Sequence, residues 1–127
     1  MIFWNVDMIR KRILLLFDSV ALCQLLRDIL QDEFHCIVSI LYDTNNYYSV
    51  LFEFCPDLII ATSYVHLPLV TQISQNELFR SIPIISTSKS LSYKQAIEAG
   101  AVDFFPNPID INELLEKINY HLVHSPN

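Results

Sequence analysis

Short apolar segments alternate along the chain with stretches in which apolar residues recur at helical spacing. The short apolar segments are predicted to be strands: residues 12–17, 36–42, 57–62, 82–87 and 102–105. Residues 36–42 are in addition rich in β-branched residues, which favour strands. Strands that are apolar on both faces are typical of a parallel sheet with helices on both sides. With right-handed crossovers, this alternation predicts a doubly wound α/β sandwich of three layers.

Five helices are predicted between and after these strands. They cover residues 20–31, 45–54, 70–79 and 93–99, and a last helix follows Asp110, which is its predicted cap. Ser19 is the expected cap of the first helix, and Gly100 suits the left-handed position after the fourth. Residues 66–68 are expected to form an irregular loop before the third helix.

The helical spacing also predicts which side chains are buried. In the first and last helices they are Leu22, Leu25, Leu26, Ile29, Leu30, Ile111, Leu114, Leu115, Ile118 and Leu122. In the second helix, the aromatic residues expected to be buried or half-buried are Tyr47, Tyr48, Phe52 and Phe54.

Composition limits the class of protein. A chain of 127 residues with 52% hydrophobic and 17% charged residues predicts one domain with a real core. The net charge of −6 argues against binding to nucleic acid or to an anionic membrane surface. The single glycine leaves no glycine-rich phosphate loop, and we expect no cofactor.

Cysteine usage and the N-terminal region bear on location and organisation. Cys23, Cys36 and Cys55 show neither a disulfide framework nor a zinc motif, which favours free thiols in the cytoplasm. The apolar run at residues 13–17 is too short for a signal core or a membrane span. We expect an apolar extension at residues 1–10, a domain at residues 11–123 and a tail at residues 124–127.

Ligands of doubly wound sheets bind beyond the carboxyl ends of the strands, so these ends decide the function. These ends are expected at residues 17–19, 62–64, 86–89 and 105–108. Four segments in and beside these strands are distinctive: residues 12–18, 56–60, 82–85 and above all 99–108, where a Gly-Ala pair precedes an acidic-aromatic strand and a proline. In these segments the chain resembles the receiver domain of bacterial response regulators over roughly residues 11–122. The resemblance implies the flavodoxin-like, CheY-like fold with five helices and strand order 2-1-3-4-5.

The resemblance also places the family's functional positions on this sequence. Its first strand ends in two acids that help hold Mg²⁺, and here the pair reads Phe17-Asp18. Its phosphoacceptor aspartate is matched by Thr62, and its lysine after the fifth strand is matched by Asn107. The family's hydroxyl switch residue is matched by Ser88.

Two further family positions lie in the last strand region. Phe104 occupies the position of the family's aromatic switch residue. The Asn107-Pro108 bond matches a family bond that is often cis, so Pro108 is predicted to follow a cis peptide bond.

These replacements remove the chemistry of phosphotransfer. The reaction needs a carboxylate nucleophile and a divalent ion that neutralises the phosphoryl oxygens. Thr62 has no ionised oxygen, and Asp18 alone is a poor anchor for Mg²⁺. We therefore predict a pseudo-receiver, without catalytic residues or metal, that signals through protein contacts. Asp18 is expected at the positive end of the first helix, and a residual weak cation site is the alternative.

Two other functions remain open. One is a receiver phosphorylated at a non-standard residue. The other is a small α/β hydrolase that uses the hydroxyl cluster of Thr62, Ser63, Ser86, Thr87 and Ser88. No base is predicted near this cluster, since His66 lies in a loop of unpredicted geometry. His121 and His124 are expected to be solvent-exposed at a helix end and not to bind zinc.

The resemblance implies an interaction surface over the fourth helix, the fifth strand and the fifth helix, which would suit a homodimer or a protein partner of a signalling pathway. The candidate residues are Lys89, Lys94, Glu98, Asp103, Asn112, Glu116 and Asn119. The aromatic N-terminal extension is a second candidate for a partner contact.

Overall fold

Five parallel strands form one sheet in the order β2-β1-β3-β4-β5, as predicted. The computed structural model describes residues 10–17, 19–42, 44–62, 67–88, 92–106 and 110–123, with the side chains of residues 44 and 62 left out. The strands are β1 (Arg12–Leu16), β2 (Ile37–Ile40), β3 (Leu58–Thr62), β4 (Ile84–Ser88) and β5 (Asp103–Pro106). β2 and β5 are therefore the two outermost strands of the sheet.

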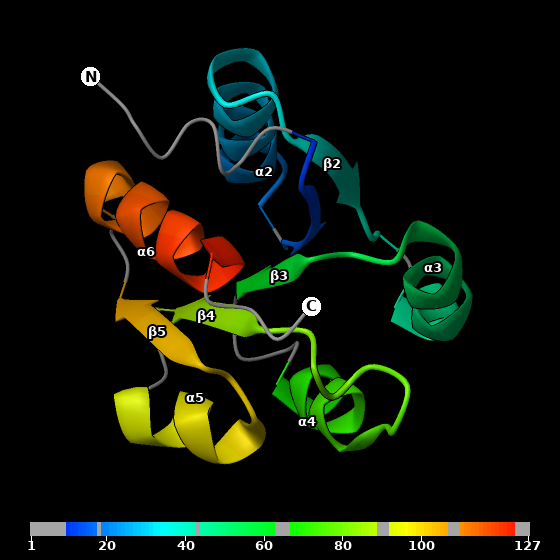
Figure 1. Cartoon of the computed structure of the whole chain (residues 1–127). Coiled ribbons are helices and arrows are strands. Elements are labelled where there is room, and N and C mark those ends of the chain that lie inside the picture. The colour runs from blue at the N-terminus through cyan, green and yellow to red at the C-terminus, as the bar shows by residue number, and fades with distance from the viewer. Residues whose placement is uncertain are drawn as a thin grey trace.

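Five α-helices cover the sheet within the described ranges. They are α2 (Val20–Asp28), α3 (Tyr47–Phe54), α4 (Leu67–Gln75), α5 (Tyr93–Ala99) and α6 (Ile111–Val123). A π-helical turn, η1 (Ile29–Glu33), continues α2, and a 3₁₀ turn, η2 (Thr44–Asn46), precedes α3. Helices α2 and α6 cover one face of the sheet, and α3, α4 and α5 cover the other (Figure 1). The three-layer sandwich is confirmed.

The continuous apolar strands are explained by two separate cores, one on each face of the sheet. Along β1, Ile13 and Leu15 pack into the core under α2 and α6, whereas Leu14 and Leu16 pack into the core under α3 and α4. Successive side chains of a strand point to opposite faces. The buried part of β1, residues 13–16, is therefore apolar at every position.

The predicted caps are confirmed. The Ser19 hydroxyl accepts a hydrogen bond from the Leu22 N–H at 3.3 Å at the start of α2. The Asp110 Oδ1 accepts one from the Glu113 N–H at 3.2 Å at the start of α6. Gly100 ends α5 with φ of 122°, a conformation that L side chains rarely adopt.

The prediction for the third helix was wrong at both ends. Helix α4 begins at Leu67 and not at residue 70, because Pro68 lies in the first turn, where its missing N–H removes no helical hydrogen bond. The helix ends at Gln75, and residues 77–80 form turns. The strand bounds differ from the prediction by one or two residues. Strand β5 extends to Pro106, which an edge strand tolerates.

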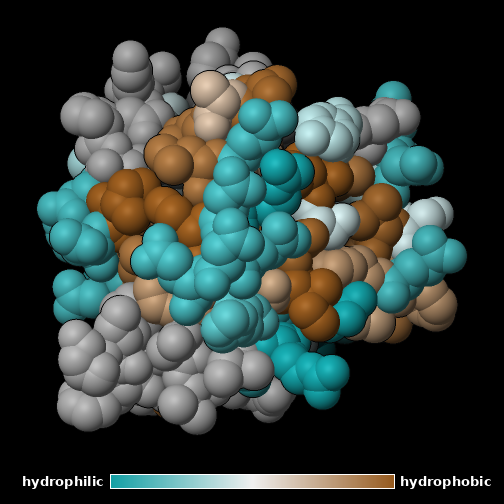
Figure 2. Space-filling model, turned by 90° about the horizontal axis from the view of Figure 1, so that it is seen from above, coloured by the Kyte–Doolittle hydropathy of each residue, from teal (hydrophilic) through white to brown (hydrophobic). Residues whose placement is uncertain are grey.

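Some predicted core residues lie at the surface. Leu25 is 50% exposed because it lies at the margin of the α2 stripe, whereas Leu26 packs against the sheet. Tyr48 and Phe52 of α3 are also exposed. Seen from the α2 side, a ridge of polar side chains crosses the surface, with apolar side chains on both sides of it (Figure 2). The apolar content of this chain therefore exceeds what its core contains.

Candidate functional site

The carboxyl ends of four strands lie together along one side of the sheet, called here its carboxyl edge, and the amino ends of the strands form the opposite, amino edge. In register, Leu16 of β1 lies beside Ala61 of β3, Thr62 beside Thr87 of β4, and Ser88 beside Pro106 of β5. This alignment brings the predicted pocket positions Phe17, Thr62 and Ser88 to the same edge. Asp18, Asn107 and Pro108 lie outside the described residues, as does the side chain of Thr62.

The described side chains of this edge are uncharged. Phe17 is buried in the core formed with α2 and α6. At the end of β4, Ser86, Thr87 and Ser88 are all buried. No group of three or more potential metal ligands occurs among the residues that the structure describes. The described part of the site therefore offers hydroxyl groups and an apolar wall, but no carboxylate.

Asp57 is the carboxylate nearest in sequence to Thr62, so it is the first candidate to replace the missing acid of the site. It lies, however, at the amino edge of the sheet. It directly precedes β3, whose carboxyl end is Thr62. Its Oδ2 accepts a hydrogen bond from the Arg12 N–H at 2.8 Å, and its own N–H donates to the Arg12 carbonyl oxygen at 2.6 Å. These bonds hold Asp57 at the amino end of β1, a full strand length from Phe17.

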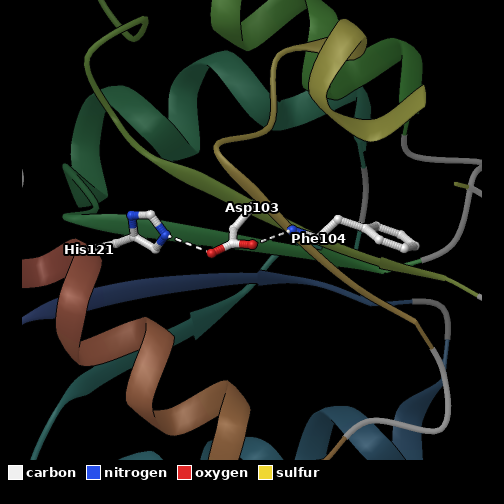
Figure 3. A network of polar contacts seen from close by, with 3 residues as sticks. All are labelled: Asp103, Phe104 and His121. Carbon is white, nitrogen blue, oxygen red and sulfur yellow. Dashed lines mark hydrogen bonds and ion pairs between the residues drawn. The ribbon is translucent and has the colours of Figure 1, made fainter. Parts of the chain in front are cut away.

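The two predicted switch residues lie on neighbouring strands but not side by side. Ser88 pairs in register with Pro106, and Phe104 pairs with Ser86. Phe104 is half-buried, and its N–H donates to the Asp103 Oδ1 at 2.9 Å. Its ring points away from Asp103 and His121 (Figure 3).

Asp103 is bonded and not a free surface carboxylate. Its Oδ2 lies 3.1 Å from the His121 Nε2, and the two side chains are only 18% and 15% exposed (Figure 3). The expectation that His121 is a solvent-exposed helix-end residue was therefore wrong. The sequence carries a signal for this burial, because His121 follows Leu114 and Ile118 by seven and three residues on the buried stripe of α6.

The other interface candidates have mixed surroundings. Lys94 and Glu98 of α5 and Asn112 and Glu116 of α6 are exposed. The Oδ1 of Asn119 is buried without a hydrogen-bond partner among the described residues. Lys89 lies outside the described residues.

The hydroxyl cluster has no described histidine beside it. His121 contacts Asp103, the first residue of β5, and His35 precedes β2, so both lie toward the amino ends of the strands. His66 and His124 lie outside the described residues. The described geometry contains no nucleophile with an adjacent base of the kind that a hydrolase needs.

Comparison with solved structures identifies the fold. A two-component response regulator from Clostridium difficile aligns with a TM-score of 0.79 and 18% identity, over 93% of this chain and 100% of that one. The N-terminal domain of the nisin resistance regulator NsrR, a lantibiotic response regulator, aligns with a TM-score of 0.73 and 25% identity, over 88% and 97%. An orphan response regulator of H. pylori aligns with a TM-score of 0.74 and 19% identity, over 88% and 96%.

The comparisons at sequence level give no match: neither a family model nor a curated protein corresponds to the chain. The chain nevertheless has the receiver-domain fold of response regulators. No helix in the described ranges is both long enough and apolar enough to cross a membrane.

Proposed function

We propose that the chain is a pseudo-receiver, a non-enzymatic signalling module that works through contacts with other proteins and is not switched by an aspartyl phosphate. The burial of Phe17 in the core is the observation that carries this proposal. An aromatic ring occupies the place where the resemblance expects one of two acids for Mg²⁺. Thr62 and Asn107 remove the nucleophile and the cation that the same reaction needs.

The placement of Asp57 supports the same function. A receiver could regain part of its acidic site if another carboxylate reached the carboxyl edge. Asp57 is held by two hydrogen bonds to Arg12 at the amino edge, so it does not reach. The three cysteines are free thiols, which suits the cytoplasm, a reducing compartment.

Intact mass measurement tests the loss of phosphotransfer. The whole chain is incubated with acetyl phosphate and Mg²⁺ and compared with an untreated sample. The expected result is an unchanged mass, because no carboxylate nucleophile ends β3. A gain of one phosphoryl group that hydroxylamine removes would contradict the proposal. A stable gain on a serine or threonine would instead support the alternative of phosphorylation at a non-standard residue.

We place the protein contact on the surface formed by α5, β5 and α6. Lys94, Glu98, Asn112 and Glu116 are exposed on these helices, so charged and amide groups are free to pair with a second copy or another protein. Sedimentation of the chain and of the Glu98→Lys and Glu116→Lys variants tests the homodimer, with Glu53→Lys on α3 as the matched control. A molecular mass in solution that falls from dimer to monomer only in the Glu98→Lys and Glu116→Lys variants supports this surface as the dimer contact.

A further inference from the structure

A cavity of about 610 Å³ lies at the amino edge of the sheet, at the opposite end of the strands from the site described above. It is formed where the end of α3 meets the segment that enters β3 and the turns that follow α4. Its size falls in the range of pockets that hold small organic molecules.

Large apolar side chains line this cavity and remain partly in water. Phe52 and Leu78 are 62% and 58% exposed. The Tyr48 ring stacks on Phe52, with centroids 6.5 Å apart and planes 7° apart, and meets Phe79 edge-on at 5.3 Å. Removing apolar surface from water is favourable, so a flat apolar ligand that covers these side chains gains affinity from the contact.

Asp57 is the one charged residue among the described residues that line the cavity. Its Oδ2 accepts the Arg12 N–H, but the Arg12 guanidinium is directed elsewhere. The Arg12 Nε donates to the Phe54 carbonyl oxygen at 2.6 Å, and the guanidinium carbon lies 4.4 Å from the centre of the Phe54 ring. In the part of the chain that the structure describes, no cationic side chain forms an ion pair with Asp57.

We propose that this cavity binds a small organic cation with a flat apolar body, such as an arylalkylamine. Its apolar part would cover Phe52 and Leu78, and its ammonium group would pair with Asp57. A carboxylate without a counter-ion beside low-dielectric walls attracts a cation more strongly than one in open solvent. The cavity shares no residue with the carboxyl edge of the sheet, so this binding does not depend on the function proposed above.

Three probes of one shape test the proposal. Phenylethylamine, phenylethanol and phenylpropionate carry a positive, a neutral and a negative group on similar apolar bodies. Each is titrated into the nitrogen-labelled whole chain, and the amide chemical shifts are followed. The amine is expected to bind about tenfold more tightly than the alcohol, with shifts centred on Phe52, Asp57 and Leu78, and the acid is expected to bind most weakly. Equal affinity of amine and alcohol, shifts centred elsewhere, or no binding would overturn the proposal.

Two variants separate the charge from the apolar wall. Asp57→Asn keeps a carbonyl acceptor for the Arg12 N–H and removes the charge, so the amine should lose about tenfold in affinity and the alcohol should lose none. Leu78→Ala, at an exposed position, should weaken the amine and the alcohol alike. Asp32→Asn on η1, at an exposed position that does not line the cavity, is the matched control and should change neither. Unchanged amine affinity in Asp57→Asn would contradict the proposed pairing, and the comparison of the three probes on the unmodified chain stands without any variant.

Discussion

Gly100 shows how one residue limits the packing of two helices. It is the only glycine of the chain, it ends α5 with φ of 122°, and it lies against Ser74 of α4. A Cβ at this position would lie 2.5 Å from the Ser74 Cβ and closer still to its Oγ. The Ser74 hydroxyl donates to the Thr71 carbonyl oxygen at 3.0 Å, so it has little freedom to move away.

Gly100→Ala is therefore expected to destabilise the fold by about 2–4 kcal/mol, the sum of a strained backbone and an overpacked contact. Urea denaturation measures this change as a lower midpoint at similar slope. Gln72→Ala, at an exposed position of α4, is the control and should change stability by less than about 0.5 kcal/mol. Equal stability of the two variants would show that the close approach of α4 and α5 is absent in solution.

Cys36 links burial to the pH dependence of stability. Burial raises the pKa of its thiol from 9.0 to about 12. Between pH 9 and pH 12 the unfolded chain loses this proton and the folded chain keeps it, so the free energy of unfolding falls as pH rises. The contribution is fully present below pH 9, and the slope from this one group is at most about 1.4 kcal/mol per pH unit.

Chemical denaturation at several pH values above 9 measures this slope. Cys36→Val keeps a small apolar side chain and removes the titration, so its stability should depend less on pH than that of the parent. Cys55→Ser serves as the control, because Cys55 is exposed. The same slope in Cys36→Val and the parent would rule out the buried thiol as the cause.

At the scale of elements, the contact between Asp103 and His121 joins the edge strand β5 to α6. Asp103→Asn keeps an oxygen that can accept the Phe104 N–H, and His121→Gln keeps a polar side chain of similar reach. In a double-mutant cycle at neutral pH, we expect a coupling energy of about 0.5–1.5 kcal/mol, the size of a typical protein hydrogen bond. Single effects that add to the double effect within about 0.3 kcal/mol would mean that the contact contributes nothing.

Elements whose signals are local were predicted well. The limits of α5 were correct, because its end is set by Gly100 and its start by a reciprocal capping box between Ser92 and Gln95. The prediction for α4 was wrong because Pro68 reads as a helix breaker until its place in the first turn is known. Local sequence rules therefore predict that a segment is helical more securely than they predict the residue at which the helix begins.

Contacts between distant elements were harder to predict. His121 lies on the buried stripe of α6, but its bond to Asp103 depends on where α6 crosses β5. Tyr48 and Phe52 are exposed because the turns after α4 cover only a small part of α3, which the sequence of α3 alone does not predict. The candidate site was predicted as positions at one edge, and the register of the strands brings Phe17, Thr62 and Ser88 to that edge. Asp18, Asn107 and Pro108 remain predictions.

At the scale of the whole molecule, the two edges of the sheet differ in character. The described side chains of the carboxyl edge are uncharged, whereas the amino edge holds Asp57 in an apolar cavity. In the function proposed above, the receiver fold serves as a scaffold for protein contacts and is not switched by an aspartyl phosphate. Acyl phosphates are therefore expected to leave this chain unchanged.

The amide spectrum of the whole chain, recorded with and without acetyl phosphate and Mg²⁺, tests this claim most directly. The account predicts that the signals of Phe17, Ser88 and Phe104, which report on the edge and on the predicted switch residues, keep their positions. New positions for these signals that revert when the acyl phosphate is exhausted would contradict it.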